Sequence, residues 1–128
     1  MNQIILLDDS HVSSLMISTI IKSAEFDSNL HQPSNPKDAE KICADHATQV
    51  LIIDLHMPGQ NPVITAYLFN DQFDIRHSIV IGKPGIGLEE ECRALGYKFI
   101  GRPVNEKSVL KAITPLLETK VMSVGKTA

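Results

Sequence analysis

The sequence contains no tryptophan and only two cysteines, and aromatic residues make up 5% of its 128 positions. Cys43 and Cys92 cannot build a disulfide framework, so we expect reduced thiols and a cytoplasmic protein. Long apolar runs are also missing. The run Ile4–Leu7 ends at Asp8, too early for a membrane span, and no segment has the pattern of a signal peptide. We therefore expect no contact with a membrane.

An excess of basic charge is absent as well. Twelve Lys and Arg residues stand against fifteen Asp and Glu residues, for a net charge of −3. A domain whose main task is to grip a phosphate backbone is normally basic, so we expect no direct binding of nucleic acid. The length suits one domain, which at this size buries about two-thirds of its unfolded surface. It leaves no room for a separate effector domain.

The sequence does contain a regular alternation of short apolar runs and helical patterns. Strands are predicted at Ile4–Leu7, Val50–Ile53, Ser78–Ile81 and Tyr97–Ile100, with a weak one at Asp27–His31. Helices are predicted at Val12–Ala24, from Asn35-Pro36, from Asn61-Pro62 to about Asn70, at Leu88–Leu95 and after Asn105, with a kink or restart at Pro115. The alternation predicts a single α/β domain with a parallel sheet covered by helices on both faces.

Three aspartates follow two of the most hydrophobic strands. Asp8 and Asp9 end the first strand, and Asp54 ends the strand at Val50–Ile53. In parallel sheets, ligands bind beyond the carboxyl ends of the strands. Clustered carboxylates raise one another's pKa, and Mg²⁺, which prefers oxygen ligands, would relieve this. An aspartate beside Mg²⁺ is also a competent nucleophile for a phosphoryl group. The simpler alternative is that these acids are solvated strand ends or helix caps.

The segments that carry these residues resemble a known family. Ile4–Ser10, Leu51–Gly59 and Arg102-Pro103 resemble the receiver domain of two-component response regulators, and the likeness extends over residues 1 to about 120. It implies a flavodoxin-like, doubly wound, five-stranded parallel sheet with the strand order 2-1-3-4-5. We assign residues 1–120 to this domain, and residues 121–128 to a C-terminal tail or the start of a linker.

The resemblance also implies roles for the acidic residues. Asp54 would be the phosphoacceptor. Asp9 and Asp54 would hold Mg²⁺, and Asp8 would act through water or as a neighbouring charge. The position of His56, two residues after Asp54, further suggests that its backbone carbonyl completes the Mg²⁺ ligands and that His56 affects the access of water to Asp54.

Other positions depart from the family pattern. The Thr or Ser at the end of the fourth strand is replaced by Gly82, and the small residue after it by Lys83. Phe99 stands at the position of the switch aromatic, although a plain core role would also explain it. We expect Lys83 either to supply a cation near the phosphoryl group or to point into solvent.

A further departure lies at the end of the fifth strand. Receivers usually have a Lys here, which contacts the phosphoryl group. In this sequence the residue is Arg102, whose planar guanidinium differs from the compact ammonium of lysine. The resemblance implies a cis bond before Pro103.

Three functions follow for such a domain. In the first, a histidine kinase or phosphotransfer protein phosphorylates Asp54, and the domain signals to a downstream protein or to a missing C-terminal output domain. The second is a degenerate receiver that acts as a phosphorylation-independent interaction or dimerisation module, with a homodimer through the last helix and its neighbouring strand. The third, a small Mg²⁺-dependent aspartyl phosphatase, ranks last, because no second acid stands two residues after Asp8 or Asp54. We therefore expect a signalling domain and not an enzyme acting on other substrates.

Overall fold

The computed structural model describes residues 1–118. The expected tail at 121–128 lies outside these residues, as do the last two positions of the expected domain. Five strands alternate with five helices in the described part. The strands are β1 (Asn2–Asp8), β2 (Ser28–His31), β3 (Thr48–Asp54), β4 (Ile75–Gly82) and β5 (Lys98–Gly101). The helices are α1 (His11–Ser23), α2 (Pro36–Asp45), α3 (Pro62–Gln72), α4 (Leu88–Leu95) and α5 (Glu106–Ile113), followed by the 3₁₀ turn η1 (Thr114–Leu116).

The five strands form one parallel sheet in the order β2-β1-β3-β4-β5. This confirms the predicted flavodoxin-like fold. The chain leaves β1 towards β2 on one side and returns to β3 on the other, so the strand order reverses between β1 and β3. In such sheets the reversal leaves a crevice beyond the carboxyl ends of the strands, which is where ligands bind.

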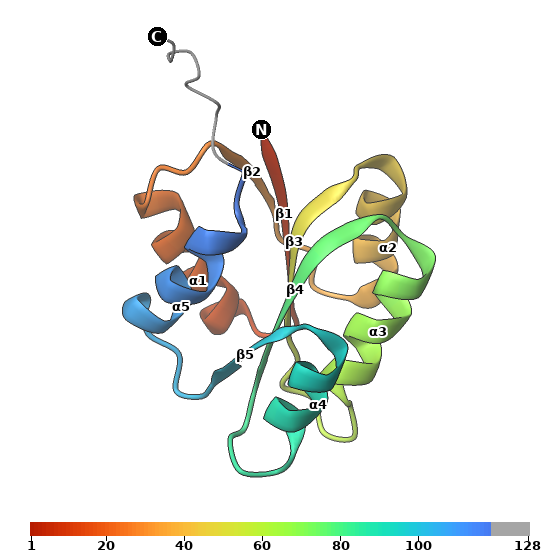
Figure 1. Cartoon of the computed structure of the whole chain (residues 1–128). Helices are drawn as coiled ribbons and strands as arrows, with labels where there is room; N and C mark the ends of the chain where they lie inside the picture. The colour runs from red at the N-terminus through yellow and green to blue at the C-terminus, as the bar shows by residue number, and fades with distance from the viewer. Residues whose placement is uncertain (119–128) are drawn as a thin grey trace, which may run out of the picture.

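Helices cover both faces of the sheet, and each face has its own apolar core (Figure 1). The side chains of a strand alternate between the faces, so neighbouring residues such as Leu6 and Leu7 enter different cores. One core joins the sheet to α2, α3 and α4, and the other joins it to α1 and α5. Burial on both faces explains why β1 and β3 are continuous apolar runs.

The helix boundaries follow local signals in the sequence. The side chains of Asn35, Asn61 and Asn105 cap α2, α3 and α5 by accepting backbone N–H groups of the first turns. Gly96 ends α4 with φ +79°, a conformation that favours glycine. Pro115 lies in η1, where the α-helix has already ended, which agrees with the predicted restart.

Three strands begin earlier than predicted. β1 starts at Asn2 and not at Ile4, β3 at Thr48 and not at Val50, and β4 at Ile75 and not at Ser78. Arg76 and His77 are exposed, so the first residues of β4 have no buried apolar pattern that would mark them as strand. Cys43 and Cys92 are free and buried, as expected. Within residues 1–118, no helix combines the length and the apolar character needed to cross a bilayer.

Candidate functional site

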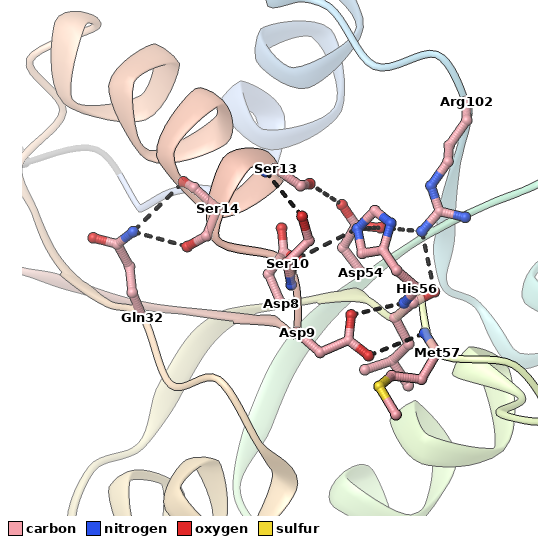
Figure 2. Close-up of polar contacts among 11 residues, drawn as sticks. Asp8, Asp9, Ser10, Ser13, Ser14, Gln32, Asp54, His56, Met57 and Arg102 are labelled. Carbon is pink, nitrogen blue, oxygen red and sulfur yellow. Dashed lines mark hydrogen bonds and ion pairs between the residues drawn. The ribbon is translucent and has the colours of Figure 1, made fainter.

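The predicted acidic site forms at the carboxyl ends of β1 and β3. Asp8 and Asp54 are register partners in the two adjacent strands, at the point where the strand order reverses. The exposed fraction is 0% for the Asp8 side chain and 1% for that of Asp54. Figure 2 shows both carboxylates between the first turn of α1 and the loop that follows β3. The expectation that these acids converge is therefore correct.

The Asp54 carboxylate is contacted by three side chains from three parts of the chain. Its Oδ1 accepts a hydrogen bond from Nη2 of Arg102, and Nε2 of His56 lies 3.2 Å from the same oxygen. Its Oδ2 accepts a hydrogen bond of 2.7 Å from the Ser13 hydroxyl. Each oxygen therefore has a donor of its own, which makes up for the loss of water around a buried carboxylate.

Arg102 reaches the site from the end of β5. Its Nη2 also donates to the main-chain oxygen of Leu55 at 3.1 Å, so one guanidinium holds the end of β3 at two points. The peptide bond between Arg102 and Pro103 is cis, the isomer that the family resemblance implies. About 31% of the Arg102 side chain remains exposed, so the cation lies at the mouth of the site.

The His56 imidazole bridges the two buried carboxylates. Its Nε2 lies 3.3 Å from Oδ1 of Asp8 and 3.2 Å from Oδ1 of Asp54. The side chain is 34% exposed and lies beside both acids. The sequence predicts a metal-binding role for the His56 carbonyl and none for its imidazole. The imidazole lies between the carboxylates of Asp8 and Asp54, at a place where a small cation could otherwise bind.

Asp9 has a different arrangement from its strand neighbour Asp8. One carboxylate oxygen of Asp9 accepts the N–H of His56 at 2.7 Å, and the other accepts the N–H of Met57 at 3.2 Å. Asp9 therefore fixes the loop after β3 in this structure (Figure 2). It is Asp8, expected to act only indirectly, that lies in register with Asp54.

Asp8 retains an oxygen without a partner. Its Oδ1 accepts the N–H of Ser10 at 2.9 Å, whereas its buried Oδ2 makes no hydrogen bond with residues 1–118. Burial raises the pKa of the Asp8 carboxyl, and the charge of Asp54 acts in the same direction, against the lowering effect of the hydrogen bond from Ser10. One ligand atom each from Asp8, Asp9 and His56 lie within 4.8 Å of one another. An unpartnered carboxylate oxygen in such a cluster fits a hard divalent cation.

At the end of β4, Gly82 leaves no space for a larger side chain. A Cβ atom on Gly82 would lie 2.7 Å from Cδ1 of Leu88 and 3.5 Å from Cε1 of Phe99. Leu88 is buried, and Phe99 packs against the same core. The position where receivers carry a hydroxyl is therefore closed by apolar groups. Lys83 is exposed and makes no hydrogen bond or ion pair within the described residues, so no contact joins it to Asp54 here.

Ser13 is the site residue that the sequence did not single out. It lies in the first turn of α1, and its backbone N–H donates to the hydroxyl of Ser10, the N-cap, at 3.3 Å. The cap aligns the start of α1 with the end of β1, and this brings the Ser13 hydroxyl to Asp54. A polar residue on the first turn of a helix after an acid-ended strand was the available signal. Ser14 shares that description, so the pattern alone could not select Ser13.

The fold can be compared with proteins of known structure. No model of a known protein family matches the sequence, and a search of curated proteins finds no match. The search of solved structures does find matches. Chemotaxis protein CheY4 of Vibrio cholerae is 18% identical, with a TM-score of 0.74, and the match covers 91% of this chain and 99% of CheY4.

Two further structures match over a similar part of this chain. The signal receiver domain of a DNA-binding response regulator protein from Colwellia psychrerythraea 34H is 20% identical, with a TM-score of 0.79, covering 93% of this chain and 100% of that domain. A putative two-component system response regulator/GGDEF domain protein is 16% identical, with a TM-score of 0.76. That match covers 90% of this chain but 48% of the other. The chain therefore has the receiver-domain fold.

Proposed function

We propose that this domain accepts a phosphoryl group on Asp54 and signals by changed contacts with another protein or domain. The observation that carries the proposal is the placement of Asp54. Its carboxylate is buried at the carboxyl end of β3, in register with Asp8, and Arg102 donates to it. A carboxylate at this place is a nucleophile with a cation beside it. Phosphoryl transfer depends mainly on such positioning and on charge stabilisation.

The bonds that form and break in the transfer step belong to Asp54 and the donor. A carboxylate oxygen of Asp54 forms the new bond to phosphorus, and the bond between phosphorus and a donor histidine nitrogen breaks. The electron pair of that bond returns to the donor imidazole. Arg102 would then pair with the phosphoryl oxygens, since a guanidinium binds such oxygens through parallel hydrogen bonds. The expected phosphoryl contact of Lys83 would require its exposed side chain to move towards Asp54.

The proposed cofactor is Mg²⁺. The unpartnered Oδ2 of Asp8 and the carboxylate of Asp54 would provide oxygen ligands, with Asp9 and the His56 carbonyl as further ligands. The ion would offset negative charge on the phosphoryl oxygens. For Asp9 to ligate, it would have to release at least one of the two N–H groups that it accepts.

The proposed partners follow from the same function. The donor would be a histidine kinase or a phosphotransfer protein. The receiver of the signal would be a downstream protein or an output domain, such as the GGDEF domain in the name of one structural match. A homodimer through β5 and α5 is a further possibility of this fold. The chemistry of the domain would be limited to its own phosphorylation and dephosphorylation.

A second candidate function, a phosphorylation-independent interaction module, is favoured by one specific observation. Arg102 and Ser13 already donate to the Asp54 carboxylate, His56 lies 3.2 Å from it, and Leu88 crowds the position of the switch hydroxyl. A domain with these contacts holds the Asp54 carboxylate in place without a phosphoryl group. It could keep one conformation and bind its partner constantly.

Beryllofluoride, a phosphoryl mimic, distinguishes the two functions. Amide spectra of the wild type would be recorded with Mg²⁺ alone and with Mg²⁺ plus beryllofluoride, with Asp54→Asn as the control. The phosphoacceptor function predicts changes around Asp54, Arg102 and Gly82 in the wild type and none in the variant. Spectra that do not respond to beryllofluoride would favour the interaction module.

A further inference from the structure

We propose that the Ser13 hydroxyl shortens the lifetime of the phosphorylated state by stabilising the free carboxylate of Asp54. The proposal rests on the proposed function, because it concerns the same aspartate. Within residues 1–118, Ser13 provides the one side-chain hydroxyl that hydrogen-bonds Asp54, at 2.7 Å. It approaches from α1, whereas a hydroxyl at the end of β4 is absent.

Local contacts fix the position of Ser13 at the start of α1. Its N–H is held by the Ser10 hydroxyl, and its side chain is half-buried beside Asp54. The neighbouring serine does something else, because the Ser14 hydroxyl accepts a hydrogen bond of 3.0 Å from Nε2 of Gln32 (Figure 2). Of these two adjacent serines on one helical turn, Ser13 contacts the acceptor Asp54 and Ser14 contacts Gln32.

The two oxygens of Asp54 have different surroundings. Oδ1 is contacted by Arg102 and His56, and Oδ2 by Ser13. The cation at Oδ1 marks that side as the one where a phosphoryl group would gain a partner. Oδ2 would then become the carbonyl oxygen of the acyl phosphate, and the Ser13 hydroxyl would still donate to it.

The strength of this hydrogen bond depends on the state of Asp54. A hydrogen bond to a charged carboxylate is roughly twice as strong as one to a neutral carbonyl oxygen. Ser13 therefore stabilises the carboxylate more than the acyl phosphate. In hydrolysis, water attacks phosphorus, the bond between phosphorus and Oδ1 breaks, and the electron pair stays on the carboxylate. The water proton leaves with inorganic phosphate and solvent. Negative charge grows on the carboxylate as that bond breaks, so Ser13 also lowers the barrier.

The β4 side of the site offers no substitute for this hydroxyl. A Cβ on Gly82 would lie 2.7 Å from Cδ1 of Leu88 and in contact with Phe99. The loss of Ser13 would consequently leave Oδ2 without a side-chain hydroxyl. The direction of the effect is specific: removing Ser13 prolongs phosphorylation and does not abolish it.

The test measures the decay of the phosphorylated form of the full chain. The protein is phosphorylated with acetyl phosphate and Mg²⁺, the donor is removed by rapid desalting, and the phosphorylated fraction is followed by intact mass. Ser13→Ala should decay about threefold to tenfold more slowly than the wild type, the range expected from the difference between charged and neutral hydrogen bonds. Ser13→Thr, which keeps a hydroxyl, and Ser14→Ala, the matched control, should decay at the wild-type rate.

Each outcome has a definite meaning. Decay of Ser13→Ala at the wild-type rate or faster overturns this inference while the proposed function stands. A wild type that takes up no phosphoryl group overturns the proposed function and this inference with it. If Ser13→Ala does not fold, Ser13→Cys serves in its place, because a thiol has similar size but donates weakly, and it should likewise slow the decay.

Discussion

The guanidinium of Arg102 donates directly to Oδ1 of Asp54, so a cation from the end of β5 lies on the carboxylate at the end of β3. These ends are not adjacent in the sheet, because β4 lies between them. The contact therefore links the ends of β3 and β5 across β4, at the end of the sheet that carries the site.

Arg102→Ala should destabilise the domain by about 1–3 kcal/mol, because Oδ1 of the buried Asp54 carboxylate loses its hydrogen-bond donor. The cost stays below that of a fully buried ion pair, because Arg102 is partly exposed and His56 and Ser13 remain on Asp54. The stability of Arg102→Lys should fall between that of Arg102→Ala and that of the wild type, because lysine keeps the charge but lacks the planar guanidinium. Urea unfolding measures the free energy of unfolding of each variant.

Arg93→Ala is the control, because it breaks the exposed Arg93–Glu89 pair and should cost at most about 0.5 kcal/mol. Equal losses for Arg102→Ala and Arg93→Ala would show that the Asp54 contact adds no stability.

His56→Ala should bind Mg²⁺ more tightly than the wild type. The imidazole lies within 3.3 Å of an oxygen of Asp8 and of one of Asp54, so a cation must displace it or share these oxygens with it. Loss of a contact worth about 1 kcal/mol corresponds to about fivefold tighter binding. Titration of amide resonances with Mg²⁺ measures the affinity, and His77→Ala, an exposed histidine on β4, is the control. Weaker binding in His56→Ala would instead identify the imidazole as a ligand.

Gly82→Ser should destabilise the wild type more than it destabilises a Leu88→Ala background. The new Cβ would lie 2.7 Å from Cδ1 of Leu88, the tip of a flexible side chain, so the expected cost is about 1 kcal/mol, the low end for overpacking. Leu88→Ala removes that atom and opens the space that a serine needs. A double-mutant cycle by urea unfolding measures the coupling. Additive costs would mean that Leu88 does not restrict this position.

Stability should decline at alkaline pH because of Cys92. Burial raises the pKa of this thiol to about 11, from an ordinary value of 9.0. Below pH 9 the thiol is protonated in both the folded and unfolded states. Between about pH 9 and 11 the unfolded chain loses the proton first, so unfolding is favoured by at most about 1.4 kcal/mol per pH unit from this group. Cys92→Ala should have a flatter stability profile over this range. A profile as steep as that of the wild type would assign the decline to other groups.

Much of the fold could be predicted from the sequence, because its signals are local. Apolar runs on strands buried from both sides, the asparagine caps and Gly96 all act within a few residues. The convergence of Asp8 and Asp54 could also be predicted, since both end strands of a parallel sheet.

The contacts within the site could not be predicted in the same way. They depend on side-chain rotamers and on how α1 is rotated about its axis over the sheet. Ser13 and Ser14 look alike in sequence, yet one contacts Asp54 and the other Gln32. Likewise, the distance between Leu88 and Gly82 follows from the path of the loop before α4 and from no local pattern.

Intact mass after incubation with acetyl phosphate and Mg²⁺ shows directly whether Asp54 is a phosphoacceptor. The wild type should gain the mass of one phosphoryl group, the gain should require Mg²⁺ and disappear with hydroxylamine, and Asp54→Asn should gain nothing. A wild type whose mass stays unchanged, or an Asp54→Asn variant that gains the same mass, would contradict the role of Asp54 as phosphoacceptor.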